Sequence, residues 1–189
     1  CTAGEFPSVL PAKSREEFEQ KIREIFGDKA DEFLALPEAN VCENDAFYAK
    51  VNGIDCTVKG ILGAKKASGD TKNHYCYKFD ADIPGWDNPG TFHSVDLWFF
   101  FETLAKCWRP FVGRHYDLSR QMCNYWANFI KTGDPNGEDA DGTPMPKWEP
   151  YTNEKPCEMV FTGEGPVADC SQPSKFEQMV TDKIMEQFK

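Results

Sequence analysis

The sequence contains no long hydrophobic run. Its longest uninterrupted apolar stretch extends only from Leu97 to Phe101 in a chain of 189 residues. A transmembrane helix needs about 20 consecutive apolar residues, so we exclude one. The first residues, CTAGEFPSV, also lack the basic and apolar segments of a signal peptide, and they do not begin with Met. We therefore expect a soluble chain that is part of a longer protein.

Positive charge is scarce as well. Lys and Arg number 21 against 31 Asp and Glu, which gives a net charge of −10 at neutral pH. A surface that binds nucleic acid phosphates needs a basic patch, and an anionic membrane attracts the same kind of patch. The composition therefore excludes nucleic acid and membrane surfaces as partners.

Metal-binding spacings are missing too. The eight cysteines form no CxxC pair and no cluster with histidine, which argues against a zinc site. The acidic loop 134–142 fails the spacing of a calcium-binding helix–loop–helix, and we expect it to be solvated. No metal or organic cofactor is expected. The even cysteine count permits disulfides, but cysteines set among apolar residues favour reduced thiols and a cytoplasmic location, with secretion as the alternative.

Local patterns predict more helix than strand. Capping boxes at Ser14 and Ser174 open two amphipathic helices, and other apolar stripes follow the helical period. The expected helices cover residues 14–27, 28–36, 44–67 with an interruption near Gly53, 94–104, 118–130 and 174–188. The expected strands are 74–80 and 157–162. Since two strands alone form a marginal sheet, we predict a helix-rich α/β fold, with few strands packed by several helices and residues 1–189 as a single unit.

His93 occupies a junction that suits a catalytic base. It follows an expected strand and the loop IPGWDNPGTF, and it precedes a helix. A loop side chain is accessible while the helix behind holds it, and imidazole exchanges a proton near neutral pH. The alternative is a histidine that satisfies a backbone group at the helix start. His74 and His115 lack such a setting, and we expect both on the surface.

Glu5 lies in the turn Gly4-Glu5-Phe6-Pro7, where a lone carboxylate is usually solvated. On a rigid turn, a carboxylate has a second use. It orients a histidine through the Nδ1 proton, which is the third role in an acyl-transfer triad. The aromatic residues from Trp98 to Phe101 are expected mostly in the core, because four consecutive helical residues point all round a helix.

A series of motifs resembles the C-terminal portion of type B carboxylesterases, the α/β-hydrolase family that includes para-nitrobenzyl esterases and cholinesterases. The motifs follow one another as YCYKFD, GTFHSVDLWFFFETL, WRPF, NYWANFIKTGDPNG and the W-x-P-Y turn at 148–151. The resemblance implies that His93 is the catalytic base of an ester hydrolase and that Glu5 is the acid that orients it.

The family's nucleophile is missing from the sequence. It is a serine in a G-x-S-x-G turn, and none of the seven serines stands in such a pentapeptide. The oxyanion-hole glycines are missing too. The resemblance therefore implies a C-terminal part of a carboxylic-ester hydrolase, without cofactor, acting on small uncharged or apolar esters through a serine supplied upstream. The chain alone is expected to be inactive.

Two alternatives remain open at this point. Relatives of this fold that serve in adhesion have lost members of the triad, so the chain is alternatively a noncatalytic interaction module. The second alternative is a stand-alone helical domain. As part of a hydrolase, the chain lacks the half that would cover its sheet edge and apolar helix faces, which predicts self-association or docking with the missing N-terminal half.

Overall fold

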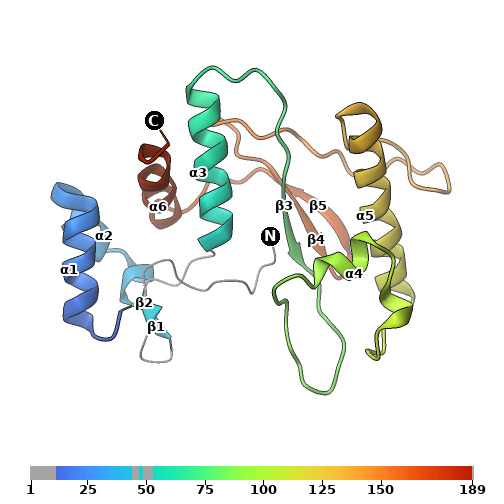
Figure 1. Ribbon diagram of the computed structural model, residues 1–189, viewed down its shortest axis with the longest axis horizontal. Helices are drawn as coiled ribbons and strands as arrows, with labels where there is room; N and C mark the ends of the chain where they lie inside the picture. The colour runs from blue at the N-terminus through green and yellow to red at the C-terminus, as the bar shows by residue number, and fades with distance from the viewer. Residues whose placement is uncertain (1–11, 44–46, 49–52, 189) are drawn as a thin grey trace. The chain divides into compact units, whose positions relative to one another are not determined.

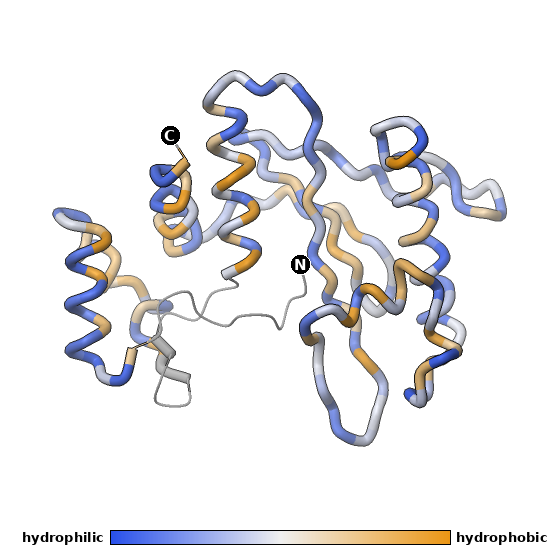
Figure 2. The backbone as a smooth tube through the Cα atoms, in the orientation of Figure 1, coloured by the Kyte–Doolittle hydropathy of each residue, from blue (hydrophilic) through white to orange (hydrophobic). Residues whose placement is uncertain are grey.

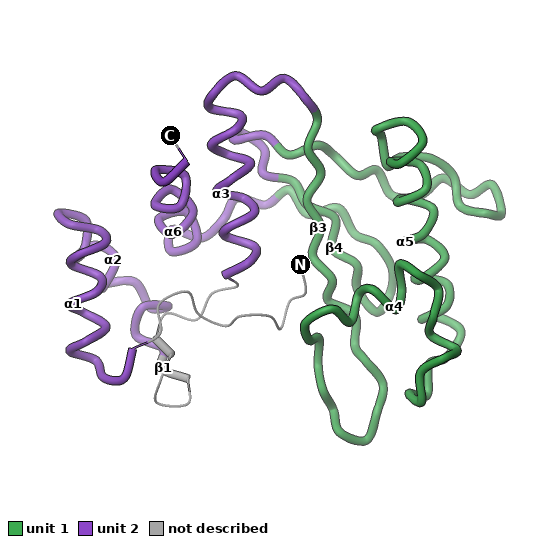
Figure 3. The backbone as a smooth tube through the Cα atoms, viewed as in Figure 1, with its two compact units in different colours: residues 1–5, 73–151, 157–170 green, residues 6–72, 152–156, 171–189 purple. Residues whose placement is uncertain are grey.

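The computed structural model describes residues 12–43, 47–48 and 53–188 (Figure 1). Backbone contacts group these residues into two compact units (Figure 3). Unit 1 contains Asn73–Tyr151 and Cys157–Cys170. Unit 2 contains the described residues of 12–72, Thr152–Pro156 and 171–188. The expectation that residues 1–189 act as a single unit stays a prediction.

Unit 1 is built on a mixed three-stranded sheet. The order is β3–β4–β5, with bounds Cys76–Asp80, Glu158–Thr162 and Gly165–Asp169. β3 and β4 run parallel, whereas β4 and β5 form an antiparallel hairpin. The parallel register pairs Tyr77 with Met159 and Phe79 with Phe161. Because side chains alternate along a strand, these four lie on one face of the sheet.

Helices cover that aromatic face. The helical elements of unit 1 are α4 (Asp96–Phe100), a 3₁₀ turn (Leu104–Lys106) and α5 (Gly113–Thr132). The ring of Tyr77 meets Phe100 of α4 and Trp126 of α5 edge-on, with centroids 5.4 and 5.3 Å apart. Phe79 packs against Phe99 at 4.8 Å. One core therefore joins the sheet, α4 and α5, and the predicted helix-rich α/β class is confirmed.

α5 follows the predicted apolar stripe only in part. Leu118, Met122 and Tyr125 are buried, as a helix with one core-facing side requires. Phe129 and Ile130, expected in the same stripe, are 46% and 77% exposed, so that expectation was wrong for the last turn. The helix ends where Gly133 takes a left-handed conformation at φ +80° and donates its N–H to the Phe129 carbonyl.

A disulfide closes the β4–β5 hairpin. It joins Cys157 to Cys170 at the open end of the hairpin, next to the paired residues Glu158 and Asp169. The expectation of reduced thiols is therefore wrong for these two cysteines, although Cys56, Cys76, Cys107 and Cys123 are free. The bridge also removes the main support for a cytoplasmic location, because structural disulfides persist mainly in oxidising compartments.

Unit 2 is mainly helical. Its α-helices are α1 (Arg15–Phe26), α2 (Ala30–Leu34), α3 (Gly53–Ala67) and α6 (Lys175–Glu186). Its remaining elements are 3₁₀ turns at Gly27–Lys29 and Pro37–Asn40, and the antiparallel strands β1 (Cys42–Glu43) and β2 (Phe47–Tyr48). Hydrophobic and hydrophilic residues alternate around the turns of α1 and α3 (Figure 2), as expected for helices with one buried face.

Both predicted capping boxes mark helix starts. Ser14 accepts a hydrogen bond from the backbone N–H of Glu17 at the start of α1. Ser174 does the same for Glu177, and the Glu177 carboxylate accepts from the Ser174 N–H at 2.9 Å. These bonds satisfy backbone donors that the first helical turn leaves free, so the two boundaries follow from local sequence.

α3 and α6 approach closely because α3 carries glycine at the contact. A Cβ atom at Gly60 would lie 2.6 Å from Cγ2 of Ile184, and one at Gly63 would lie 2.7 Å from Sδ of Met185. Any larger side chain at Gly60 must therefore displace the aliphatic end of Ile184.

Two expected helices differ from the structure, and one strand was not expected. Of the helix expected over 44–67, Gly53–Ala67 is helical, whereas Phe47–Tyr48 is strand β2, paired with β1, and residues 44–46 and 49–52 lie outside the described residues. The helix expected over 94–104 is confined to Asp96–Phe100, because Glu102 takes a left-handed φ of +49°. β5 was not expected, since Gly165-Pro166 is typical of a turn; pairing with β4 supplies its backbone partners. Among the described residues, no helix combines the length and hydropathy needed to cross a membrane.

Candidate functional site

His93 lies in a turn between β3 and α4. The loop of residues 81–92 leaves the end of β3, and residues 93–95 turn the chain into Asp96, the first residue of α4. The His93 side chain is exposed, whereas Val95, two residues later, is completely buried. His93 is thus accessible and precedes an anchored helix start, as its place in the sequence predicted.

The turn around His93 has a constrained backbone. Val95 donates its N–H to the Phe92 carbonyl at 3.1 Å, and Leu97 donates to the Ser94 carbonyl at 3.2 Å. Ser94 has a φ of +65°, which is uncommon for a residue other than glycine. A strained residue next to a candidate base is a feature often found at functional sites, where the surrounding contacts hold the backbone in place.

α4 is tied to the sheet and to α5 by polar contacts. Asp96 is 6% exposed and accepts a 2.8 Å hydrogen bond from the Tyr77 hydroxyl of β3. Ser119 of α5 donates its hydroxyl to the Phe99 carbonyl at 2.6 Å. These side chains satisfy polar groups inside the core, so the helix that follows His93 has a defined position within unit 1.

Glu5, the candidate acid, lies outside the described residues. Its pairing with His93 stays a prediction that rests on the resemblance.

His115 was expected on the surface, and that expectation is wrong. It is 3% exposed, and its Nδ1 accepts the backbone N–H of Val112 at 2.9 Å, which caps the start of α5. Burial lowers the pKa of its imidazole, because a buried site disfavours the cationic form. The third histidine, His74, is half-buried at the approach to β3. His115 is therefore a structural residue, and His93 is the exposed histidine.

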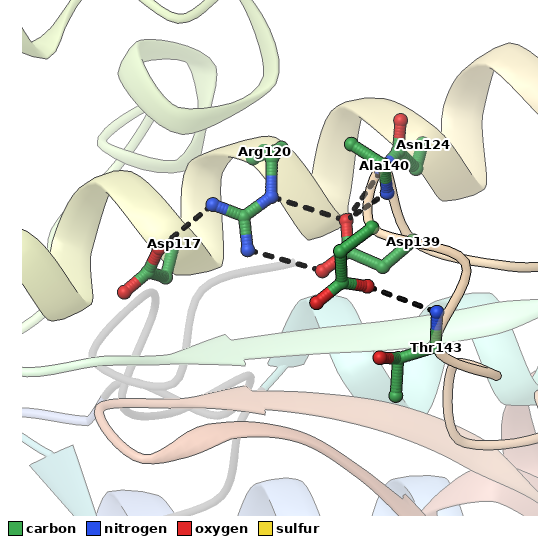
Figure 4. Close-up of polar contacts among 7 residues, drawn as sticks. Asp117, Arg120, Asn124, Asp139, Ala140 and Thr143 are labelled. Carbon is green, nitrogen blue, oxygen red and sulfur yellow. Dashed lines mark hydrogen bonds and ion pairs between the residues drawn. The ribbon is translucent and has the colours of Figure 1, made fainter.

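The acidic loop is bound to α5 rather than solvated. Arg120 donates Nε and Nη2 to the two carboxylate oxygens of Asp139 at 3.1 and 3.0 Å, and Asn124 donates to the same carboxylate at 2.7 Å (Figure 4). Asp139 is 9% exposed. The Arg120 hydrogen bonds lower the pKa of this carboxyl group, which keeps it ionised at neutral pH. The expectation of a solvated loop was wrong for Asp139.

Sequence reasoning missed an ion pair beside the His93 turn. Arg109 and Asp87 form a two-point salt bridge across the loop that leads to His93. The only sequence signal was the WRPF motif, which was noted for its resemblance and not for a contact. No group of three or more His, Cys, Asp and Glu side chains in the described part of the chain is arranged to hold a metal ion.

Comparison with known proteins places this chain in a family. The sequence profile of the carboxylesterase family matches residues 12–178. Acetylcholinesterase of Gallus gallus is 35% identical over 83 residues, which cover 41% of this chain and 10% of that protein. Bile salt-activated lipase of Homo sapiens is 32% identical over 99 residues, which cover 49% of this chain and 12% of that protein.

A solved structure agrees at the level of the fold. An esterase from anaerobic Clostridium hathewayi superposes on 96% of this chain and 36% of its own, with a TM-score of 0.53 and 19% sequence identity. The chain therefore spans a small part of the relatives it matches: 10% and 12% of the two curated proteins. Since the family profile matches most of the chain and the fold agrees, this chain belongs to the carboxylesterase family.

Proposed function

We propose that this chain carries the catalytic base, and the acid, of a serine carboxylic-ester hydrolase whose nucleophile lies upstream. His93 is the base and Glu5 is the acid. The single observation that supports the role of His93 is its position: an exposed imidazole in a constrained turn, directly before a helix fastened to the core.

The chemistry assigned to His93 follows a triad. The upstream serine hydroxyl attacks the ester carbonyl carbon while the His93 imidazole takes the hydroxyl proton. The tetrahedral intermediate collapses to an acyl-serine, and His93 returns the proton to the departing alcohol. A water molecule then releases the acid by the same sequence of proton transfers. Glu5 accepts the Nδ1–H of His93 and stabilises the imidazolium that forms twice in each turnover.

The substrate class that we propose is a small uncharged or apolar ester. Large apolar side chains are exposed in the segments on both sides of His93, with Trp86 at 91% and Phe101 at 71%. Such surfaces favour apolar acyl or alcohol groups over charged ones. The Clostridium hathewayi esterase of similar fold can hydrolyse aliphatic aromatic polyesters.

Activity should depend on residues encoded before Cys1. We expect no hydrolysis of p-nitrophenyl acetate by this chain, because it lacks the serine turn and the oxyanion-hole glycines. The same chain extended by an upstream segment with a G-x-S-x-G turn should hydrolyse the ester and react with a fluorophosphonate probe. Turnover by the short chain that disappears in His93→Ala contradicts the prediction. An extended protein that is folded but neither labelled nor active supports the noncatalytic module instead.

Uncovered apolar surface predicts association of this chain. Among the described residues, β3 pairs with β4 alone, so its other edge has no strand beside it. Exposed hydrophobic residues of unit 1 include Trp86, Leu97, Phe101, Trp108 and Val112. We propose that the missing N-terminal half docks here, and that copies of the chain self-associate without it.

Sedimentation of the purified chain at micromolar concentration measures this directly. We expect a mass above the 21.5 kDa monomer, and a lower mass for Trp86→Ser/Phe101→Ser. A wild-type chain that sediments only as a monomer would contradict the proposal that the outer edge of β3 and the exposed apolar residues drive association.

A further inference from the structure

The loop before His93 is held by a residue that comes after α4. Residues 81–92 contain two prolines and two glycines and carry no helix or strand. A loop of this kind needs side-chain contacts to keep one conformation. The contacts come from Arg109, in the segment between the Leu104–Lys106 turn and α5.

Arg109 forms hydrogen bonds with two residues of the loop. Its guanidinium donates to both carboxylate oxygens of Asp87, at 3.0 and 2.9 Å, and to the Pro84 carbonyl at 3.1 Å. The Arg109 side chain is 8% exposed and that of Asp87 is 32% exposed. The hydrogen bonds from Arg109 lower the pKa of Asp87, so the pair is ionised at neutral pH. This two-point geometry suits a planar guanidinium, and a lysine ammonium cannot reproduce it.

The same guanidinium also rests on the residue that precedes His93. Its Cζ lies 5.7 Å from the ring centroid of Phe92. The Phe92 ring in turn packs edge-on against Trp98 of α4 at 5.8 Å. Phe92 is therefore held between Arg109 and α4, and its carbonyl accepts the Val95 N–H that closes the His93 turn. A shift of the Phe92 backbone would move His93 with it.

The loop backbone fits closely around this ion pair. A Cβ atom at Gly85 would lie 2.4 Å from Oδ1 of Asp87 and 2.5 Å from Nη1 of Arg109. A side chain at position 85 would therefore displace the end of Asp87 or of Arg109 from its present place. The buried Nε of Arg109 has no hydrogen-bond partner among the described residues.

We propose that Arg109, fixed by Asp87, is a positioning residue that holds the Phe92–His93 turn and so keeps the imidazole in one orientation toward the upstream serine. The inference rests on the proposed catalytic role of His93. If it holds, the catalytic role of His93 also depends on Arg109 and Asp87, which do not take part in proton transfer.

Arg120 provides a matched control. It also forms a two-point bridge to a buried carboxylate, that of Asp139, and it also fixes a loop of unit 1. Its hydrogen bonds go to Asp139 and Asp117, outside residues 81–93, so Arg120→Lys perturbs an equivalent ion pair in a different loop. Loss of an ion pair should lower the stability of both Arg109→Lys and Arg120→Lys. Only Arg109→Lys should affect His93.

The test that does not need catalysis is NMR of this chain with ¹³C-labelled histidine. His74, His93 and His115 give three ring signals, assigned by single substitutions. We expect Arg109→Lys and the milder Asp87→Asn to shift and broaden the His93 signal while the His74 signal stays in place. Arg120→Lys should leave the His93 signal unchanged. A folded Asp87→Asn or Arg109→Lys variant with an unaltered His93 signal would overturn the inference.

Kinetics of the extended, active protein provide the second test. We expect Arg109→Lys to lower kcat about 10- to 100-fold with little change in KM, because a misplaced base slows chemistry and not substrate binding. Arg120→Lys should retain the wild-type kcat. If the His93 signal responds to Arg109 but His93→Ala remains active, the proposed function fails and the positioning contact stands. If kcat is unchanged in Arg109→Lys while His93→Ala is inactive, the positioning role fails.

Discussion

His93→Ala in the extended, active protein should lower kcat by roughly 10⁴- to 10⁶-fold, because a triad without its base loses nearly all of its catalytic advantage. The exposed imidazole lies in a turn whose backbone is held by the Phe92–Val95 hydrogen bond. Removing it should leave that turn folded. Steady-state hydrolysis of p-nitrophenyl acetate, with the folded state checked by circular dichroism, measures the loss.

His74→Gln serves as the control for this substitution. His74 is a half-buried histidine of the same unit, at the approach to β3, and nothing assigns it a role in catalysis. We expect its kcat to stay within a few-fold of wild type. Retention of a tenth or more of kcat in His93→Ala would remove His93 from the mechanism.

Phe161→Ala should destabilise unit 1 by about 3–5 kcal/mol, since it deletes a fully buried ring from a close-packed core. Phe161 is 0% exposed, and its ring centroid lies 5.7 Å from that of Trp148 and 5.9 Å from that of Tyr125. A small domain has a total stability of about 5–15 kcal/mol, so the loss is a large fraction of it.

Tryptophan fluorescence during urea denaturation isolates this effect. All five tryptophans of the chain lie between positions 86 and 148, within unit 1, so unit 2 contributes none of the signal. Val167→Ala is the control, because Val167 lies on β5 of the same hairpin but is 53% exposed, and we expect a change of about 0.5 kcal/mol or less. Equal losses for Phe161→Ala and Val167→Ala would contradict the assignment of the core.

Elements with a complete local signal were predicted from the sequence. The capping boxes at Ser14 and Ser174 place the starts of α1 and α6, because their hydrogen bonds join residues three positions apart. β3 was also predicted, because its aromatic residues roughly alternate with others and turn formers flank the segment, and β4 was predicted as a short second strand. The position of His93 between a strand and a helix followed from the order of these elements.

Elements that depend on a distant partner were not found. β5 carries Gly165 and Pro166 and becomes a strand because β4 lies beside it. The burial of His115 depends on the packing of the α5 start, and the contact of Asp139 with Arg120 joins positions 19 residues apart. Hydrophobic periodicity and local turn motifs describe neighbouring residues, so they contain no information on such distant contacts.

The sequence by itself determined the family resemblance, the candidate base and the absence of a G-x-S-x-G serine within the chain, because each is written in a contiguous motif. Only the tertiary structure decided that His93 is exposed while His115 is buried, and that Arg109 reaches back 22 residues to Asp87. The physical reason is that burial and salt bridges depend on distances in space, which packing of the sheet, α4 and α5 sets and which local propensity does not.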